Sequence, residues 1–160
     1  RVLFRSLLRP SVIFGKDDQF INLFAKLQKV FPFMPLASAN TRFQPVWVHD
    51  VAQALVHCVN TPSTEGQVFE ACGPDVMTLA ELVQLAGRWA GCPRPVVPLP
   101  HAIAWLQALL MEWLPGPTLM SRDNLASMKV HNISNGHAPG LRALGISEPK
   151  SIKRLFVATP

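Results

Sequence analysis

The sequence contains no tyrosine, so this chain alone cannot carry out a reaction that needs a phenolic acid or base. It also lacks the Gly-x-Gly-x-x-Gly and P-loop turns that hold phosphates, and the Gly-x-Ser-x-Gly and His-Glu-x-x-His motifs of hydrolases. The closest glycines, Gly87 and Gly91, end an amphipathic segment, where we expect Gly91 to cap a helix. These absences exclude a self-contained nucleotide-binding or hydrolytic site of these types.

Cysteine is scarce as well. Cys58, Cys72 and Cys92 are odd in number and share no close spacing, so no disulfide framework is expected. The thiols fit a reduced, cytoplasmic protein. The five histidines form no zinc-binding pattern with them, and no metal site is predicted.

Charged residues make up only 16% of the chain, against 49% hydrophobic residues. This balance excludes a disordered chain, and we expect part of the apolar surface to be covered by further chain or by a partner. The formal charge is +5, but among the scattered cations only Lys150, Lys153 and Arg154 form a compact group. Proteins that bind nucleic acids usually gather Lys and Arg on one face, so no nucleic-acid partner is expected.

No hydrophobic run is long enough to cross a membrane. The longest, 102–114, is interrupted by Gln107 and Glu112 and falls short of the roughly 20 residues that a spanning helix needs. The chain opens at Arg1 without Met and without the apolar segment of a signal peptide. We therefore expect no signal peptide, and we expect the natural protein to begin before Arg1.

Strand-like and helix-like patterns alternate along residues 7–91. Three apolar runs bounded or interrupted by glycine or proline are interpreted as strands: LLRPSVIF (7–14), FQPVWV (43–48) and QVFEAC (67–72). After each of these runs, apolar residues recur at helical spacing. This alternation predicts an α/β fold with a largely parallel sheet. Pro10 lies inside the first run, and we expect this strand to end or bulge near Pro10 and to lead into a functional loop. We also expect the runs over 7–14 and 67–72 to belong to one sheet.

The helix starts carry recognisable caps. Asp17 or Asp18 is placed to cap the first helix, and Asp50 the second. At the third, Thr78 and Glu81 form a capping box. In the second helix we expect one face to be shared by four apolar residues: Val51, Ala54, Leu55 and Val59.

The last third of the chain is rich in proline. We expect a short strand, PVVPL (95–99), an apolar helix over 101–114 and a shorter helix over 125–129. Residues Trp105, Leu109 and Trp113 of the apolar helix could anchor it at a membrane interface. We prefer buried packing for this helix and do not expect contact with a membrane surface.

Ser11, His49 and Asp50 supply the residue types of a nucleophile, a base and an orienting acid. His49 and Asp50 are adjacent in sequence, however, and Asp50 already has a helix to cap. We therefore interpret the three as strand-end and cap residues, and predict no catalytic residue in this chain.

Three segments together resemble a known family. LLRPSVIFGKDDQFINLFAKL (7–27), RFQPVWVHDVAQAL (42–55) and QVFEACGPDVMTLAELVQLA (67–86) are similar to consecutive stretches of the extended and atypical short-chain dehydrogenases/reductases, the NAD-dependent epimerase/dehydratase family. There they follow the Tyr-x-x-x-Lys helix. The tail LPGPTLMSRDNL (114–125) most resembles bacterial relatives of the accessory nucleotide-binding subunit of respiratory complex I.

The resemblance implies an architecture: the C-terminal portion of a Rossmann-like doubly wound sheet plus a small mixed substrate-side subdomain. Residues 1–91 would supply late strands and helices of an NAD(P)-binding domain, and residues 92–160 a proline-rich, mainly helical substrate-side region. The glycine-rich turn, the ribose-binding acid and the catalytic Tyr-x-x-x-Lys would lie before Arg1.

The resemblance also implies site residues. The backbone after the Arg-Pro pair faces the nicotinamide carboxamide in this family, which implicates Pro10, Ser11, Val12 and Ile13. Pro10 would then mark the point where a ligand takes over hydrogen bonding from the sheet; the alternative is that Pro10 only ends a strand. Asn22 and Arg42 match positions that can contact substrate, and Arg42 a substrate phosphate; an exposed loop cation is the alternative for Arg42.

Two functions follow from the resemblance. The chain would be a fragment of an NAD(P)-binding oxidoreductase or epimerase-like protein of the cytoplasm, or of a non-catalytic accessory or assembly protein of the complex I type. NAD or NADP would be the cofactor of the longer protein, and we do not expect the fragment alone to bind it. The partner would be a small-molecule substrate such as a nucleotide-sugar or a quinone-related compound. We also expect the isolated fragment to form a homodimer through the exposed edge of its first strand.

Overall fold

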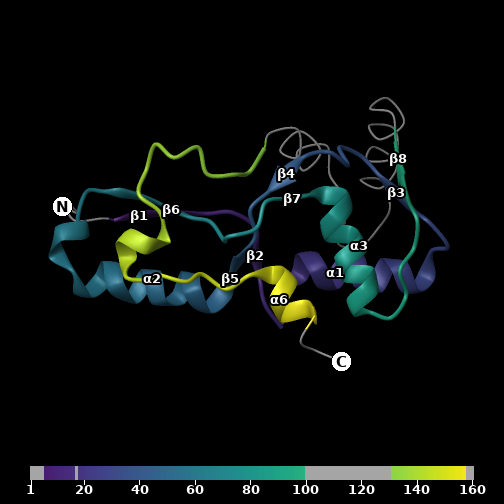
Figure 1. The fold of residues 1–160 in the computed structure, drawn as a ribbon, viewed down its shortest axis with the longest axis horizontal. Helices are drawn as coiled ribbons and strands as arrows, with labels where there is room; N and C mark the ends of the chain where they lie inside the picture. The colour runs from purple at the N-terminus through teal and green to yellow at the C-terminus, as the bar shows by residue number, and fades with distance from the viewer. Residues whose placement is uncertain (1–5, 17, 100–130, 158–160) are drawn as a thin grey trace, which may run out of the picture. The chain divides into compact units, whose positions relative to one another are not determined.

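The computed structural model describes residues 6–16, 18–99 and 131–157 (Figure 1). The chain forms two compact units. The first contains Arg1–Phe20, Phe43–Met77 and Asn132–Pro160, and the second Ile21–Arg42 and Thr78–His131. Both combine short strands with helices, which confirms the predicted α/β class.

The first unit is built on parallel strand pairs. Strand β1 (Leu7–Pro10) pairs with β6 (Val68–Ala71), and β2 (Ile13–Phe14) pairs with β5 (Val46–Trp47). The predicted pairing of the first apolar run with QVFEAC is thus confirmed for β1. The expected end of the strand near Pro10 is confirmed as well: β1 ends at Pro10, and the chain then changes its partner from β6 to β5.

The predicted strand over 43–48 is also divided. Strand β4 (Arg42–Phe43) pairs with β7 (Met77–Thr78), and β5 follows after Pro45. Proline has no amide hydrogen to donate to a ladder, which explains a break at this position.

Helix α2 (Val48–Asn60) begins two residues before Asp50, the residue predicted to cap it. Trp47 occupies its N-cap position, without a side-chain cap, so the prediction that Asp50 caps this helix is wrong. Asp50 lies in the first turn and is buried, and its Oδ2 accepts a hydrogen bond of 2.7 Å from the backbone N–H of Lys150. Asp50 therefore fixes the C-terminal segment of the unit against α2.

The core of the first unit lies between α2, β5, β6 and the 3-10 helix η2 (Leu141–Leu144). From α2 it takes Val51 and Ala54, whereas Leu55 and Val59, predicted to share their face, are exposed. The eight buried members of this core are Val46, Val51, Ala54, Phe69, Ala71, Leu141, Leu144 and Ile146. The unit also contains η1 (Pro62–Thr64) and α6 (Ile152–Val157).

The second unit holds most of α1 (Gln19–Val30), with β3 (Met34–Leu36), α3 (Leu79–Trp89) and β8 (Val96–Pro98). Strands β3 and β8 are parallel; β8 matches the predicted strand over 95–99, and β3 was not predicted. The capping box of Thr78 and Glu81 is confirmed. Gly91 also ends α3 as predicted, with φ at 70° and its N–H donating to the Arg88 carbonyl.

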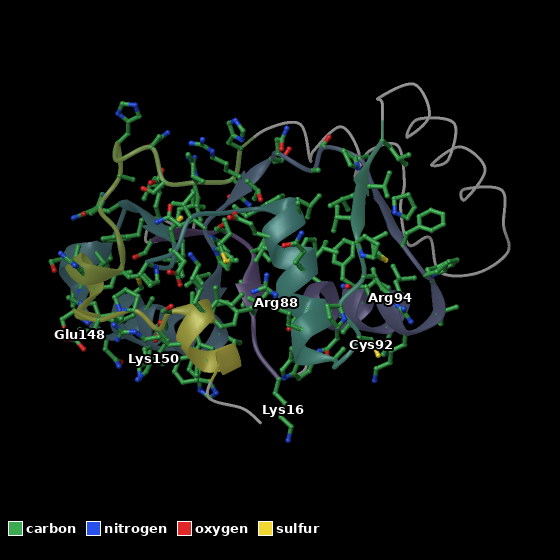
Figure 2. All side chains as sticks on the ribbon, turned by 45° about the vertical axis from the view of Figure 1, so that its right-hand side comes forward. Lys16, Arg88, Cys92, Arg94, Glu148 and Lys150 are labelled. Atoms are coloured by element: carbon green, nitrogen blue, oxygen red, sulfur yellow. The ribbon has the colours of Figure 1, made fainter. Side chains whose placement is uncertain are left out.

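Gln28 connects the elements of the second unit. It is completely buried; its Nε2 donates to the Val83 carbonyl at 2.7 Å, and its Oε1 accepts from the Arg94 N–H at 3.1 Å. Arg94 is labelled in Figure 2, as are Glu148 and Lys150, two exposed residues of the first unit. The glycine at position 87 leaves room for this side chain, because a Cβ there would lie 2.1 Å from Gln28 Oε1.

The predicted helices over 101–114 and 125–129, the tail motif over 114–125 and the proposed interfacial residues Trp105, Leu109 and Trp113 lie outside the described residues. Within the described ranges, no helix has the length and apolar character needed to cross a membrane.

Candidate functional site

The candidate site lies where β1 and β6 end. The Ser11 N–H donates to the Ala71 carbonyl at 3.1 Å, and the Val12 carbonyl accepts from the Val46 N–H at 2.9 Å. The segment thus changes its hydrogen-bonding partner from β6 to β5 at Ser11 and Val12. Ligands of open α/β sheets bind at the carboxyl ends of the strands, and this is the edge at which Pro10, Ser11, Val12 and Ile13 lie.

Ser11 is buried at this edge, with 6% of its surface exposed. Its Oγ donates to the Asn132 carbonyl at 2.9 Å and accepts from the Gln44 N–H at 3.2 Å. The hydroxyl therefore holds two distant segments together. A ligand at this edge would meet the backbone of Val12 and Ile13 rather than the Ser11 side chain.

Gln44 continues the same network. Its Nε2 donates to the Gly73 carbonyl at 2.7 Å, and its Oε1 accepts from the Ser134 N–H at 2.9 Å. Gly73 approaches the chain so closely that a Cβ at this position would lie 1.8 Å from the Pro45 carbonyl oxygen. We call Ser11, Gln44, Gly73, Asn132 and Ser134 the polar clamp.

Glu70 and Cys72 border the polar clamp. The Ser134 hydroxyl donates to Glu70 Oε2. Burial raises the pKa of the Cys72 thiol above its ordinary value, and the negative charge of Glu70 raises it further, while the backbone N–H groups of Ser11 and Ser134 partly oppose both effects. The thiol is consequently held in its protonated form at neutral pH and is a poor nucleophile there.

Asn22 and Arg42, the two predicted substrate contacts, belong to the second unit. Asn22 is half-buried on α1. The Arg42 side chain is exposed on β4, and its backbone N–H donates to Nδ1 of His131 at 3.1 Å. The four backbone residues and these two side chains are thus divided between the units.

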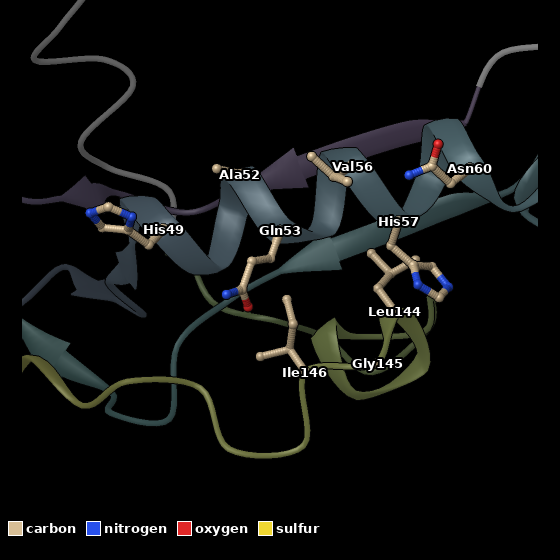
Figure 3. A pocket seen from close by; sticks show the side chains of 9 residues that line it. All are labelled: His49, Ala52, Gln53, Val56, His57, Asn60, Leu144, Gly145 and Ile146. Carbon is tan, nitrogen blue, oxygen red and sulfur yellow. The ribbon is translucent and has the colours of Figure 1, made fainter.

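Ser11, His49 and Asp50 do not form the arrangement of nucleophile, base and orienting acid considered above, because each of them contacts other groups. Ser11 bonds Asn132 and Gln44, Asp50 bonds Lys150, and the His49 ring lies 4.5 Å from the Trp47 ring between centroids. His49 instead belongs to a shallow hollow of about 490 Å³ between α2 and the turn after η2, which Figure 3 shows from close by. Within the described residues, no group of His, Cys, Asp and Glu side chains could hold a metal ion.

Sequence reasoning missed Gln44, Asn132 and Ser134. Gln44 could have been identified as a polar residue that interrupts an apolar run beside Pro45. Asn132 and Ser134 belong to no motif. Asn132 lies 121 residues after Ser11, and Ser134 lies 90 residues after Gln44, so they meet only because the chain returns to this edge of the sheet.

No family model matches the chain, but curated proteins and solved structures are similar to it. It is 30% identical to subunit 9 of the NADH dehydrogenase [ubiquinone] 1 alpha subcomplex from Mus musculus over 157 residues, which are 94% of this chain and 41% of that protein. The Arabidopsis thaliana protein of that name is 30% identical over 147 residues, 83% of this chain and 36% of its own. The chain therefore spans only about two fifths of the length of these curated relatives.

Solved structures show the fold. A nucleoside-diphosphate-sugar epimerase from Staphylococcus aureus has a TM-score of 0.60 at 14% identity, and the match covers 93% of this chain and 50% of that one. The dTDP-glucose 4,6-dehydratase of Bacillus anthracis, solved in complex with NAD, has a TM-score of 0.55 at 16% identity over 90% of this chain and 39% of that one.

These findings correct one prediction. The relatives are named as mitochondrial proteins, so the prediction of a cytoplasmic protein is wrong. Odd, unpaired cysteines indicate reduced thiols but do not distinguish between compartments that keep thiols reduced. The chain is thus similar over most of its length to the subunit 9 proteins, and it has the Rossmann-like fold of the solved epimerase and dehydratase structures.

Proposed function

We propose that this chain forms the substrate-facing part of a dinucleotide-binding protein, and that it serves as an accessory subunit of a respiratory NADH dehydrogenase. The observation that carries the proposal is the polar clamp, which fixes the backbone of Val12 and Ile13 at the carboxyl ends of parallel strands. The subunit 9 relatives support the accessory role. In the complete protein, residues 1–91 would contribute the late strands and helices of the NAD(P)-binding domain, and residues 92–160 the substrate side.

The residues present fit only one end of NAD or NADP. Val12 is half-buried and Ile13 is 37% exposed, so the backbone here can reach a carboxamide. The sequence supplies no glycine-rich turn whose amides and helix dipole would bind the pyrophosphate. We therefore propose that NAD or NADP binds the complete protein and that the 160-residue chain alone does not bind it. When bound, the cofactor would supply hydride-transfer chemistry.

An enzymatic oxidoreductase or epimerase is the second candidate, favoured by the likeness of the fold to sugar-nucleotide epimerases and dehydratases. For it we propose a nucleotide-sugar or quinone-related substrate, with Asn22 and Arg42 as contacts. Arg42 is exposed and cationic, as a residue that meets a substrate phosphate must be. No nucleic acid is proposed as a partner.

For the isolated chain we also propose a two-fold dimer through the edge of β1. Light scattering at high micromolar concentration tests this, and a monodisperse monomer would contradict it.

Titration calorimetry with NADH and NADPH tests the main proposal. The protein encoded by the complete reading frame should bind one of them, and the 160-residue chain neither. Replacement of Gln44 by Leu removes two hydrogen bonds of the polar clamp and should weaken binding by the complete protein, whereas replacement of the distant Gln53 by Leu should not. Micromolar affinity of the 160-residue chain, or equal affinity of the Gln44→Leu and unaltered complete proteins, would contradict the proposal.

A further inference from the structure

The segment that follows Ser134 carries an Asn-Gly pair in an exposed turn. Asn135 and Gly136 are both exposed to solvent. The chain is held on either side of the pair, because Ser134 belongs to the polar clamp and the Pro139 carbonyl accepts from the Glu70 N–H at 3.0 Å. The pair is therefore open to water while its flanks are fixed to the first unit.

An asparagine followed by glycine can react with its own backbone. The backbone nitrogen of the glycine attacks Cγ of the asparagine side chain and closes a succinimide ring, and the side-chain amide leaves as ammonia. Water then opens the ring to aspartate or isoaspartate, so one water is consumed for each ammonia released. Such an attack is accelerated by a base for the proton of the nitrogen and by a donor to the oxygen that gains negative charge.

The backbone nitrogen of Gly136 is accessible. Glycine has no Cβ to obstruct the approach to its nitrogen, and a Cβ at this position would find no other heavy atom within 4 Å. The φ angle of Gly136 is 73°, a conformation that side chains rarely adopt. The two reacting atoms belong to neighbouring residues, so no second molecule has to be positioned for the ring closure.

Two hydrogen bonds lead from this nitrogen to a carboxylate. The Gly136 N–H donates to Ser134 Oγ at 3.3 Å, and the Ser134 hydroxyl donates to Glu70 Oε2. As the nitrogen attacks, its proton can pass to Ser134 while the hydroxyl proton passes to Glu70. The same path returns the proton to the departing amide, which leaves as ammonia, and Glu70 becomes a carboxylate again.

The carbonyl oxygen of the Asn135 side chain has a fixed donor. The His137 N–H donates to Asn135 Oδ1 at 3.1 Å. When the nitrogen of Gly136 attacks, Cγ becomes tetrahedral and negative charge develops on this oxygen. A backbone N–H already directed at the oxygen stabilises that charge without further rearrangement.

We propose that Asn135 and Gly136 form a self-processing site, at which the folded chain converts Asn135 to aspartate and isoaspartate without the help of another protein. Gly136 supplies the nitrogen, and the His137 N–H stabilises the oxygen. Ser134 receives the proton of the nitrogen and passes its own to Glu70. The reaction uses only these contacts and does not depend on nucleotide binding.

The reaction would weaken the polar clamp. Its product places a second carboxylate beside Ser134, whose hydroxyl is already bonded to the carboxylate of Glu70, and like charges repel. The isoaspartate product also lengthens the main chain between Ser134 and Pro139 by one methylene group. The converted chain should therefore show at least threefold faster hydrogen exchange at the Ser134 N–H, which is bonded to Gln44 in the unaltered chain.

Peptide mass spectrometry of the chain, incubated at neutral pH, provides the first test. Asn135 should lose ammonia at least tenfold faster than Asn60, which is exposed but precedes Thr61. Because the proton path and the donor exist only in the folded chain, Asn135 should also react at least threefold faster there than in the same chain unfolded in guanidinium chloride. An equal or slower reaction in the folded chain, or cleavage of the chain after Asn135, would overturn the proposal.

Substitutions in the proton path provide the second test. Glu70→Gln keeps an oxygen that can accept from Ser134 but removes the base, and it should slow the reaction in the folded chain at least threefold. Ser134→Ala should slow it as much, whereas Ser134→Thr retains a hydroxyl and should keep the original rate. The matched control is Glu65→Gln, which replaces an exposed carboxylate of the same unit and should leave the rate unchanged.

The rate of each variant is compared with its own rate in guanidinium chloride, which should be the same for all of them, and circular dichroism checks that the variant is folded. If Glu70→Gln does not fold, the comparison of Ser134→Ala with Ser134→Thr decides. A folded Glu70→Gln or Ser134→Ala variant that reacts as fast as the unaltered chain would overturn the proposal.

Discussion

Replacement of Asp50 by alanine tests the reassigned role of this residue. Asp50 has only 4% of its surface exposed, and its Oδ2 accepts a 2.7 Å hydrogen bond from the Lys150 N–H. Hydrogen bonds to charged groups contribute about 1.5–3 kcal/mol, and a carboxylate in the first turn of a helix adds about 0.3–1 kcal/mol. We expect Asp50→Ala to lower the free energy of unfolding by about 2 kcal/mol, because water can replace part of the lost bond.

A loss of this size lowers the thermal midpoint by about 4–8 °C in a domain of this length. Circular dichroism measures the midpoint, and hydrogen exchange should show faster exchange at Lys150. Asp50→Asn keeps an acceptor oxygen and should lose about half as much. The matched control is Glu148→Ala, an exposed carboxylate two residues from Lys150, which should stay within about 0.5 kcal/mol. Equal midpoints for Asp50→Ala and Glu148→Ala would refute the role assigned to Asp50.

Two further predictions concern the polar clamp and its border. Gly73→Ala should destabilise the chain by about 1–3 kcal/mol in urea unfolding, because its Cβ would lie 1.8 Å from the Pro45 carbonyl oxygen. The control is Gly140→Ala, whose Cβ would have its nearest contact at 3.8 Å. Equal losses of stability in the two variants would contradict the close approach of Gly73 to Pro45. Because the pKa of Cys72 is raised, the folded state holds the thiol proton more tightly than the unfolded state does. This difference stabilises the fold at pH values below 9.0, the ordinary pKa of the thiol. The stabilisation is lost as the pH rises above that value. Urea midpoints between about pH 8 and 10 should therefore fall more steeply for the unaltered chain than for Cys72→Ser, and parallel profiles would contradict the shift.

The local features of the fold could be predicted from the sequence. The capping box of Thr78 and Glu81, the termination of α3 by Gly91 and the pairing of β1 with β6 were all predicted, and all three depend on residues adjacent in sequence or on strong apolar runs. The end of β1 at Pro10 was also predicted, whereas the strand over 43–48 was predicted as one element, because an apolar run does not reveal that the chain changes its partner at Pro45.

The function of Asp50 could not be predicted from its position. An acidic residue before an apolar helix is commonly an N-cap, but α2 begins at Val48, and the partner of Asp50 is an amide 100 residues later. The exposed face of α2 was missed for a related reason. The apolar periodicity of α2 identifies Leu55 and Val59 as candidates for burial. It does not show whether the element that would cover them belongs to the same unit of the chain as α2.

The candidate site could be predicted only as a backbone segment. The family resemblance implicated Pro10, Ser11, Val12 and Ile13, and the structure places them at the carboxyl ends of β1 and β6. The side chains that fix this segment come from Gln44, Asn132 and Ser134, which approach Ser11 only after the chain has folded.

We propose that the backbone at Val12 and Ile13 meets the nicotinamide end of a dinucleotide in the complete protein. Hydrogen exchange on the protein encoded by the complete reading frame, with and without saturating NADH or NADPH, tests it directly. We predict that the bound nucleotide slows exchange at the amides of Val12 and Ile13, while the Leu7 amide, already bonded to Gln67 within the sheet, changes little. Binding of the nucleotide with unchanged exchange at Val12 and Ile13 would contradict the account.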